Sequence, residues 1–451
     1  MLPLELLSLV CGFLPKPILK QVRQVSKIWE RAAVPWLFDE IFISQNMADL
    51  RIAKLVIFHF KQYIRTLVFS TVYYTKTYRE NFDEEFHQEI DWEFVGKSDI
   101  DSDSNNSHSD HAFAIYCIAR KNQQANLIDG SASAYLSFAL TSSANIRKIV
   151  LTDTSSSRVM SRQSLQVYEP RSSKACPIKQ CDLNDTDHIP HAVRQFGFSQ
   201  KGFTNPWRLV LLALSATSAN VKELTMEPRD MELSTNTAAF SMSPEKLSQA
   251  QLCFNTLTKI RFSLNVDTER FSTKVETRHV HRNVAKLLRS AINLESLSLN
   301  LTIESEVGMS EYSTLQSILG RCRFPKLRSL TLVLLASSEA ELLRLLKHSR
   351  NLEQLTILGH DLTEGLWLRV AAWIRASLPL LKHAEFNSLF GGFEEPWADT
   401  EYADHYGHVG DFLFGQGENP FTTKALDKCD ADIKAKRQMV NPAGDVDFVA
   451  A

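Results

Sequence analysis

The chain has 451 residues and a formal net charge of −2, with 44% hydrophobic and 23% charged residues. This composition is typical of globular folding, and the near-zero net charge excludes a global attraction to nucleic acid or to anionic lipid. The length indicates either several domains or one elongated array of repeats. No apolar run in the sequence reaches the length of a membrane span, so we expect no membrane segment.

The cysteine usage and the missing motifs narrow the function classes further. The seven cysteines are scattered and odd in number, which indicates reduced thiols and predicts a cytoplasmic or nuclear protein. The phosphate-cradling glycine motifs, the serine nucleophile elbow and the His-Glu-x-x-His zinc signature do not occur. We therefore expect no catalytic residues, no cofactor and no bound metal.

The N-terminal residues are expected to form a compact set of short helices. An apolar stripe at helical spacing follows Pro3, because proline is tolerated in the first turn of a helix. Pro15 and Pro17 end that helix, since proline lacks the N–H donor and clashes with the preceding turn. A second apolar stripe runs from Ile18 to Trp29. So small a unit rarely buries a sufficient core, so some apolar surface is expected to face a partner or the next domain.

The spacing of these N-terminal residues also resembles a known family. Leu-Pro is followed by Glu-Leu-Leu, then by a Leu-Pro break, a Leu-x-x-Val-x-x-Val run and a tryptophan, all within residues 2–44. This pattern resembles the F-box, the docking module of substrate receptors in Skp–cullin–F-box ubiquitin ligases. The resemblance implies binding to a Skp-type adaptor and through it to a cullin. The residues that it assigns to the adaptor interface are Leu2, Pro3, Leu4, Leu7, Val10, Leu19, Val22, Val25 and Trp29.

Two other interpretations of the same stretch compete with docking. The apolar run from Leu6 to Leu14 has the character of a signal peptide, but no Lys or Arg precedes it and Glu5 interrupts the approach to it. A Pro-Lys-Pro sequence also replaces the small-residue cleavage site. The stripe fits equally well as the core of a helical cap on the next domain. Ile18 stands where the F-box family often has an acidic residue, yet the combined spacing favours docking.

After Ala33 the chain is expected to leave the helices, with Pro35 ending the last of them. From there one pattern, apolar-x-x-apolar-x-apolar, recurs and indicates short strands. Its copies begin at Phe38, Ile64, Ile146, Val221, Leu257, Leu294, Leu327, Leu352 and, more weakly, Leu381. Apolar stripes at helical spacing precede most of the later copies, and Asn145, Asn220 and Asn293 each stand one residue before a copy.

Repeated helix–strand units of about 25 to 37 residues are typical of a leucine-rich-repeat solenoid. We therefore expect an α/β repeat fold, in which a short all-helical F-box precedes an irregular leucine-rich-repeat-like solenoid of helix–strand units. Parallel strands would line its concave side, with the helices outside. The copies are irregular and resemble the degenerate leucine-rich repeats of many F-box proteins. A compact α/β domain with the same alternation is the open alternative.

The expected organisation has three parts. They are an F-box at 1–44, the repeat region at 45–390 and a C-terminal cap and tail at 391–451. Two segments interrupt the repeats at about 79–110 and 152–206. The first is acidic and then low in complexity, and we expect a solvated insertion there.

Two groups of potential metal ligands were considered. A C-x4-C-x6-H-x2-H sequence begins at Cys176, but its central spacing and its histidine pair are too short for a zinc finger. His405 and His408, with aspartates nearby, would serve a metal-dependent hydrolase, although no other catalytic motif accompanies them. Surface residues are the better interpretation of both groups.

Taken together, these features predict a non-catalytic substrate-recognition subunit of a Skp–cullin–F-box ubiquitin ligase, with an unknown target protein bound by the solenoid. The alternative is a leucine-rich-repeat interaction scaffold with no part in ubiquitin transfer. The two-residue alternation of strands places part of each strand toward solvent on the concave side. The polar residues expected there are Glu223, Lys259, Arg261, Glu295, Arg328 and Gln354.

Overall fold

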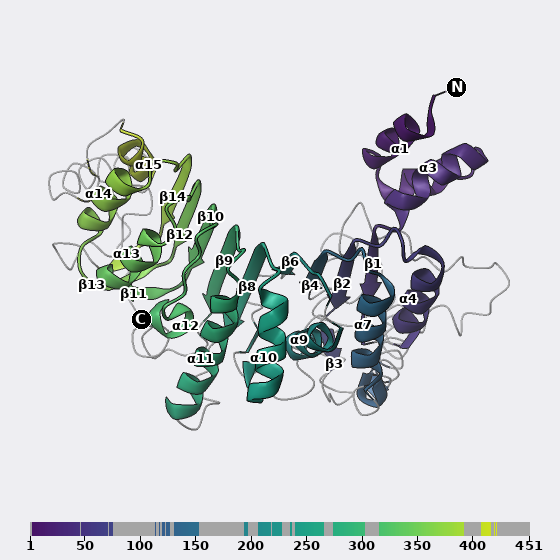
Figure 1. Ribbon diagram of the computed structural model, residues 1–451, viewed down its shortest axis with the longest axis horizontal. Helices are drawn as coiled ribbons and strands as arrows, with labels where there is room; N and C mark the ends of the chain where they lie inside the picture. Colours follow the sequence, from purple (N-terminus) through teal and green to yellow (C-terminus); the bar gives the residue numbers. More distant parts are fainter. Residues whose placement is uncertain are drawn as a thin grey trace, which may run out of the picture. The chain divides into compact units, whose positions relative to one another are not determined.

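The computed structural model divides into two compact units, residues 1–291 and 292–451. Each unit is mixed α/β, and its helices alternate with parallel strands along the chain (Figure 1). The structure describes residues 2–45, 47–70, 72–74, 130–152, 194–196, 206–217, 219–227, 235–236, 240–265, 274–302, 315–391, 407–415, 419 and 421, with single residues and short stretches between 113 and 126.

The first unit begins with three short helices. These are α1 (Leu4–Gly12), α2 (Lys16–Val22) and α3 (Lys27–Leu37). Pro3 precedes α1, as the sequence predicts, and Pro15 lies in the break between α1 and α2. Pro17 was expected to belong to that break as well, but it lies in the first turn of α2, where its missing N–H costs nothing. The apolar stripe from Ile18 to Trp29 is divided between two helices, because the Ser26 side chain caps α3 by accepting a hydrogen bond from the Trp29 N–H.

The expectation that Pro35 ends the third helix is wrong. Helix α3 continues through Pro35 to Leu37, and the Phe38 N–H donates to the Val34 carbonyl oxygen at 3.1 Å. Proline removes only its own donor, so a helix that has a single turn left loses one hydrogen bond and still closes its end.

The main sheet of the first unit has parallel strands in the order β1-β2-β4-β6-β8. They are β1 (Glu40–Ile43), β2 (Thr66–Ser70), β4 (Lys148–Thr152), β6 (Glu223–Glu227) and β8 (Lys259–Asn265), and β7 (Thr235–Asn236) also pairs with β8. The antiparallel pair β3 (Val72–Tyr74) and β5 (Arg194–Phe196) forms a separate two-stranded sheet.

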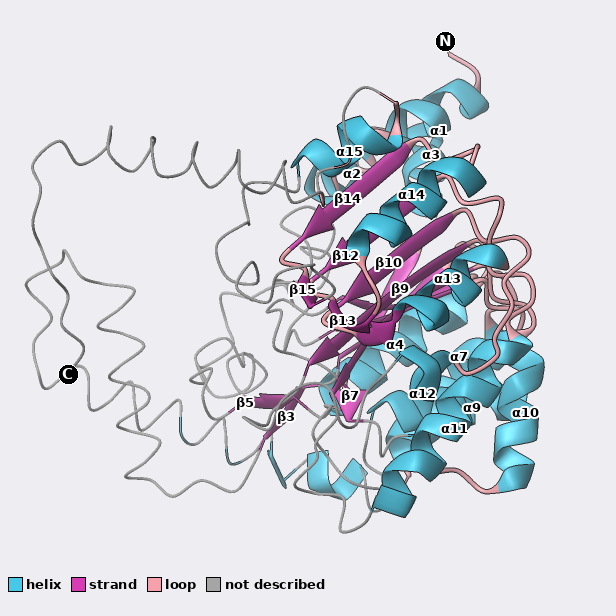
Figure 2. Cartoon of the chain, turned by 90° about the vertical axis from the view of Figure 1, so that its left-hand side faces the viewer, coloured by secondary structure: helices cyan, strands magenta, loops and turns pink. Residues whose placement is uncertain are grey.

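Helices precede or follow these strands and pack on one another in chain order. They gather along one face of the sheet (Figure 2). They are α4 (Met47–Phe60), α7 (Ser131–Ser142), α9 (Pro206–Thr217), α10 (Pro244–Phe254) and α11 (Lys274–Ser290). Their apolar stripes are buried, with Trp207 of α9 completely enclosed and in edge contact with Phe262 of β8. The core of this unit therefore lies between the helices and one face of the sheet.

The second unit repeats this arrangement. Its main sheet contains β9 (Ser296–Thr302), β10 (Ser329–Val333), β12 (Gln354–Leu358) and β14 (His383–Asn387), in that order and parallel. A second parallel sheet contains β11 (Ala336–Ser338), β13 (Asp361–Glu364) and β15 (Phe390–Gly391). The helices are α12 (Leu315–Leu319), α13 (Glu339–Lys347), α14 (Trp367–Ser377) and α15 (Gly407–Leu413).

The recurring three-apolar pattern matches the register of both main sheets. All nine predicted copies lie at a strand of a main sheet. In the first unit the middle apolar residues pair directly from strand to strand, as Ile41 with Leu67 and Leu67 with Ile149. In the second unit Leu330 pairs with both Leu297 and Leu355. Local periodicity therefore identified the strands and also the residues that align across them.

Candidate functional site

The three N-terminal helices hold together through a small core. Leu7 and Cys11 from α1 and Leu19 from α2 are buried, with exposed fractions of 3%, 0% and 1%. Ala33 of α3 is completely buried, and the Trp36 Nε1–H donates to the Ser8 Oγ at 3.1 Å across α1 and α3. Burial raises the pKa of the Cys11 thiol, so it stays protonated as a small apolar filler.

The outer surface of the same helices is unusually apolar. Phe13 is 83% exposed and Leu9 is 60% exposed. The full set of exposed large apolar residues before α3 is Leu2, Leu4, Leu6, Leu9, Val10, Phe13, Ile18 and Val25. Eight such side chains within the first 25 residues form a concentration of the kind that marks interaction surfaces, whereas single exposed apolar residues are ordinary.

The structure separates the nine predicted adaptor residues into three groups. Leu7 and Leu19 are buried among the helices, where they support the surface and have no side chain free for a partner. Val22 and Trp29 are half-buried. The members that the structure exposes are Leu2, Pro3, Leu4, Val10 and Val25.

Sequence reasoning missed four exposed apolar residues of this surface, namely Leu6, Leu9, Phe13 and Ile18. The spacing of these residues in the sequence could have identified them. Leu6, Leu9 and Phe13 recur at intervals of three and four, so they share one face of α1, whereas Leu7 and Cys11 share another. When a helix carries apolar residues on two faces and belongs to a unit with a small core, it buries only one of those faces.

A second candidate feature runs along the start of the main sheets. We call it the edge row, meaning the residue directly before each main-sheet strand. The members are Asp39, Arg65, Arg147, Lys222 and Thr258 in the first unit, and Glu295, Arg328, Glu353 and Lys382 in the second. Within each unit the backbone N–H of every member donates to the carbonyl oxygen of the member before it, at 2.7–2.8 Å. Parallel strands lie about 4.8 Å apart, so the side chains stand at regular, closely spaced positions.

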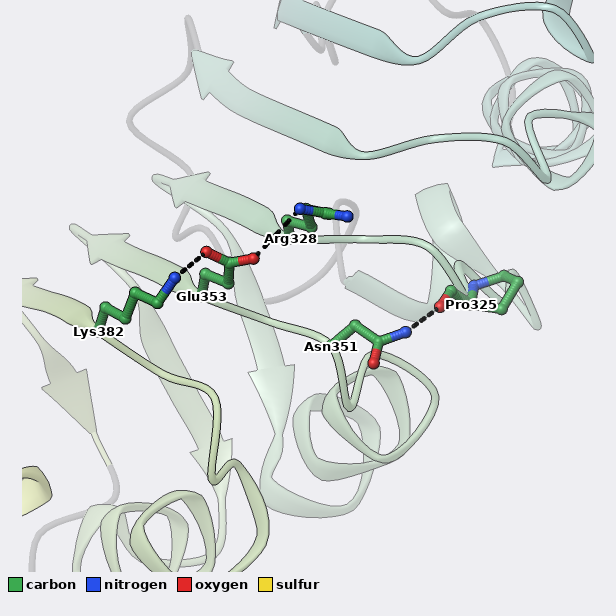
Figure 3. A network of polar contacts seen from close by, with 5 residues as sticks. All are labelled: Pro325, Arg328, Asn351, Glu353 and Lys382. Carbon is green, nitrogen blue, oxygen red and sulfur yellow. Dashed lines mark hydrogen bonds and ion pairs between the residues drawn. The ribbon is translucent and has the colours of Figure 1, made fainter.

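Charges alternate along the edge row of the second unit (Figure 3). The Glu353 carboxylate lies between two cations, 2.6 Å from the Lys382 Nζ and 3.5 Å from the Arg328 Nη1. The hydrogen bond from Lys382, together with its charge, lowers the pKa of Glu353 below its ordinary value. Near the row, the Asn351 Nδ2 donates to the Pro325 carbonyl oxygen at 2.8 Å and links the segment before β12 to the segment before β10.

The edge row of the first unit has no such alternation. Arg65, Arg147 and Lys222 are neighbours on adjacent strands, and no acidic residue separates them in the row. Arg65 and Arg147 are exposed, and one guanidinium nitrogen of Arg147 donates to the Asn220 carbonyl oxygen at 3.2 Å. Like charges held this close repel one another, so the row carries a local positive potential that an acidic partner would neutralise.

Six polar residues were expected to point from the strands to solvent, and the structure gives the exposure of each. Glu223 is half-buried. The remaining five, which are exposed, are Lys259, Arg261, Glu295, Arg328 and Gln354. One part of this sheet face was not foreseen: Phe42, Val68 and Val150, on three adjacent strands, form a buried apolar cluster. Alternation places them opposite the helix-facing Leu67 and Ile149, so this stretch of the face is covered and unavailable to a partner.

No group of three or more metal-binding side chains occurs in the part of the chain that the structure describes. Cys176 and the ligands that follow it lie outside the described residues, and so does His405. His408 falls in α15, but its side chain is likewise outside the description. Among the described helices, none combines the length and the apolar character needed to cross a bilayer.

No protein-family model matches this chain, and a search of curated proteins found no significant match.

Proposed function

We propose that this protein is the substrate-recognition subunit of a Skp–cullin–F-box ubiquitin ligase. Helices α1 to α3 would dock a Skp-type adaptor, and through it a cullin. The remainder of the chain would hold a target protein. No covalent chemistry is then required of this chain, because tethering raises the effective concentration of target lysines at the transferring partner.

The observation that carries the proposal is the exposed apolar surface of α1 and α2, together with the resemblance of residues 2–44 to the F-box. Leaving several large apolar side chains in water is costly, at about 25 cal/mol per Å² of apolar surface that a partner would bury. Phe13, at 83% exposed, is the most prominent of them and suits an interface anchor, because aromatic anchors concentrate binding energy.

We further propose that the helix–strand units form an irregular leucine-rich-repeat-like solenoid. Its support is the alignment of equivalent apolar residues across parallel strands and the recurrence of one backbone turn after the strands of the second unit. A target with an acidic segment is the best match for the basic edge row of Arg65, Arg147 and Lys222. In this proposal the solenoid supplies target specificity and the helices supply the connection to the ligase.

The test is co-purification of the full chain with a purified Skp-type adaptor. Phe13→Asp is expected to abolish capture, because a carboxylate placed in the centre of an apolar interface remains desolvated and unpaired. The matched control is Phe58→Asp in α4, since Phe58 is also exposed, at 75%, but lies outside α1–α3. Equal capture of both variants would contradict docking through this surface.

The alternative is an interaction scaffold that takes no part in ubiquitin transfer. The positively charged edge row would serve a scaffold equally well, because it requires only a bound partner. Failure of the intact chain to capture the adaptor would favour this alternative. Capture without ubiquitin transfer to any bound protein, in a reconstituted ligase, would indicate a scaffold that uses the adaptor only for attachment.

A further inference from the structure

A pocket of about 470 Å³ lies in the second unit, lined by residues of α12, of the loop that follows it and of α13. Helix α12 has five residues and α13 has nine, so the shorter helix leaves part of one face of α13 uncovered. The volume falls within the range of roughly 300–1,000 Å³ that is common for small-molecule sites. None of its lining residues belongs to α1–α3 or to an edge row.

The lining of this pocket combines apolar and polar groups. Four buried or nearly buried side chains line it: Leu315, Leu319, Cys322 and Leu345. The polar lining residues are Gln316, Arg321, Arg323, Glu341, Arg344 and His348. The lining is therefore mixed, with a polar and mostly cationic part beside a smaller apolar part.

The loop after α12 explains how two of the arginines come together. Gly320 ends the helix with a positive φ of 57°, a conformation that glycine adopts without strain. Beyond it Cys322 and Phe324 are buried, while Arg321 and Arg323 alternate with them and are exposed. Both arginines belong to the lining of the pocket, whereas Phe324 does not.

The third arginine comes from α13. Arg344 lies one turn from Glu341 and His348 on the helix face that lines the pocket, and its Nη1 donates to the Gln316 Oε1 at 2.9 Å. Glu341 supplies the one carboxylate among the described lining residues, and it accepts a hydrogen bond from the Ser338 N–H at 3.1 Å as part of the capping box of α13. The remaining charge of the lining is positive.

We propose that this pocket binds a phosphate monoester whose organic part is apolar. Three guanidinium groups offer more donors than the two oxygens of a carboxylate accept, whereas the three terminal oxygens of a phosphate monoester match them. The apolar lining would cover the organic part. This proposal is independent of adaptor docking, because none of the lining residues belongs to α1–α3.

The test is isothermal titration calorimetry of the full chain with phenyl phosphate, inorganic phosphate and benzoate. Phenyl phosphate is expected to bind about tenfold or more tightly than inorganic phosphate, because its ring is removed from water. Benzoate is expected to bind more weakly than phenyl phosphate, because it satisfies fewer donors. Absence of phenyl phosphate binding, or equal affinity for all three, would overturn the proposal.

Two variants locate the binding. The double variant Arg321→Ala/Arg323→Ala is expected to weaken phenyl phosphate binding by about tenfold or more, because two charge-assisted donors are lost. Arg350→Ala is the control, since Arg350 is exposed and does not line the pocket. All of the substituted residues are exposed, so the variants should melt as the wild-type protein does. Unchanged affinity in the double variant, or an equal loss in the control, would place the anion elsewhere.

Discussion

The Oγ of Ser337 lies 2.8 Å from the Nε2 of His360, and both side chains are completely buried. His360 occupies the place that Leu335 and Leu389 hold after the neighbouring strands β10 and β14, since each directly follows a residue with positive φ after a main-sheet strand. Those positive-φ residues are Leu334, Gly359 and Ser388. An imidazole therefore fills a leucine position, and its Nδ1 is buried without a hydrogen-bond partner among the described residues.

We predict that His360→Leu removes part of the acid sensitivity of the fold. Burial lowers the pKa of His360 to about 4, from about 6.5 in the unfolded chain. The unfolded state therefore binds more protons between these values, so the wild-type protein loses stability as the pH falls from about 6.5 to about 4. The free energy of unfolding falls by about 3 kcal/mol in total when the pH is lowered through this range, and this loss is negligible above pH 7.

The measurement is the free energy of unfolding of both proteins, by urea denaturation at several pH values between 4 and 8. His281 and Asp49, whose pKa values burial shifts to about 4 and about 6, are present in both proteins and cancel in the difference. Plotted against pH, the free energies of unfolding of the two proteins are expected to approach each other toward high pH and to separate toward low pH, where the variant is the more stable. Parallel curves would contradict this role of His360.

The separation of core and surface in α1 and α2 gives a second prediction. Leu19→Ala should destabilise the three helices by about 2 kcal/mol or more, because it opens a cavity beneath a side chain that is 1% exposed. Leu9→Ala should change their stability little, since Leu9 is 60% exposed, yet it should weaken adaptor binding. Hydrogen exchange of the amides in α1–α3 measures the first effect, and adaptor affinity measures the second. Equal stability losses would mean that Leu9 is packed in solution.

Close packing of α1 against α3 gives a third prediction. A Cβ atom at Gly12 would lie 2.9 Å from the Cζ2 of Trp36, closer than two carbon atoms approach without displacement. Gly12→Ala should therefore move the indole, disturb its hydrogen bond to Ser8 and cost about 1–3 kcal/mol, despite the better helix propensity of alanine. A double-mutant cycle with Trp36→Leu should recover most of the loss. An additive cycle would exclude the indole as the cause.

The two edge rows give a fourth prediction. Lys222→Glu would place a carboxylate beside Arg147, as Glu353 stands beside Arg328. Stability at low salt should rise by less than about 1 kcal/mol, because exposed ion pairs contribute little, and the gain should disappear in 1 M salt. Lys222→Gln, which removes repulsion without adding attraction, should show about half of the gain. A loss of stability in Lys222→Glu would show that the basic row is already neutralised within the chain.

Much of the secondary structure was predictable from local pattern. The apolar-x-x-apolar-x-apolar copies, from Phe38 to the weaker copy at Leu381, all coincide with strands. This is because every second side chain of a strand faces the core, so the pattern of burial can be read from neighbouring residues. The helix starts after Pro3 and Pro15 were predictable for a similar reason, since proline fixes its own φ and lacks a donor. The expectation that Pro35 ends the third helix was wrong, because a helix near its end tolerates one missing backbone hydrogen bond.

The sequence by itself determined where the main-sheet strands form and which apolar residues share an element face, because these depend on residues a few positions apart. Only the tertiary structure decided which face is covered. Leu7 in α1 is buried and Phe13 at the end of α1 is exposed although both are apolar, because the contact of α1 with α3 covers part of the helix surface and leaves another part to solvent. The paired charges around Glu353 and the pocket beside Arg344 likewise come from residues on different helices and strands, which come together only when the strands align.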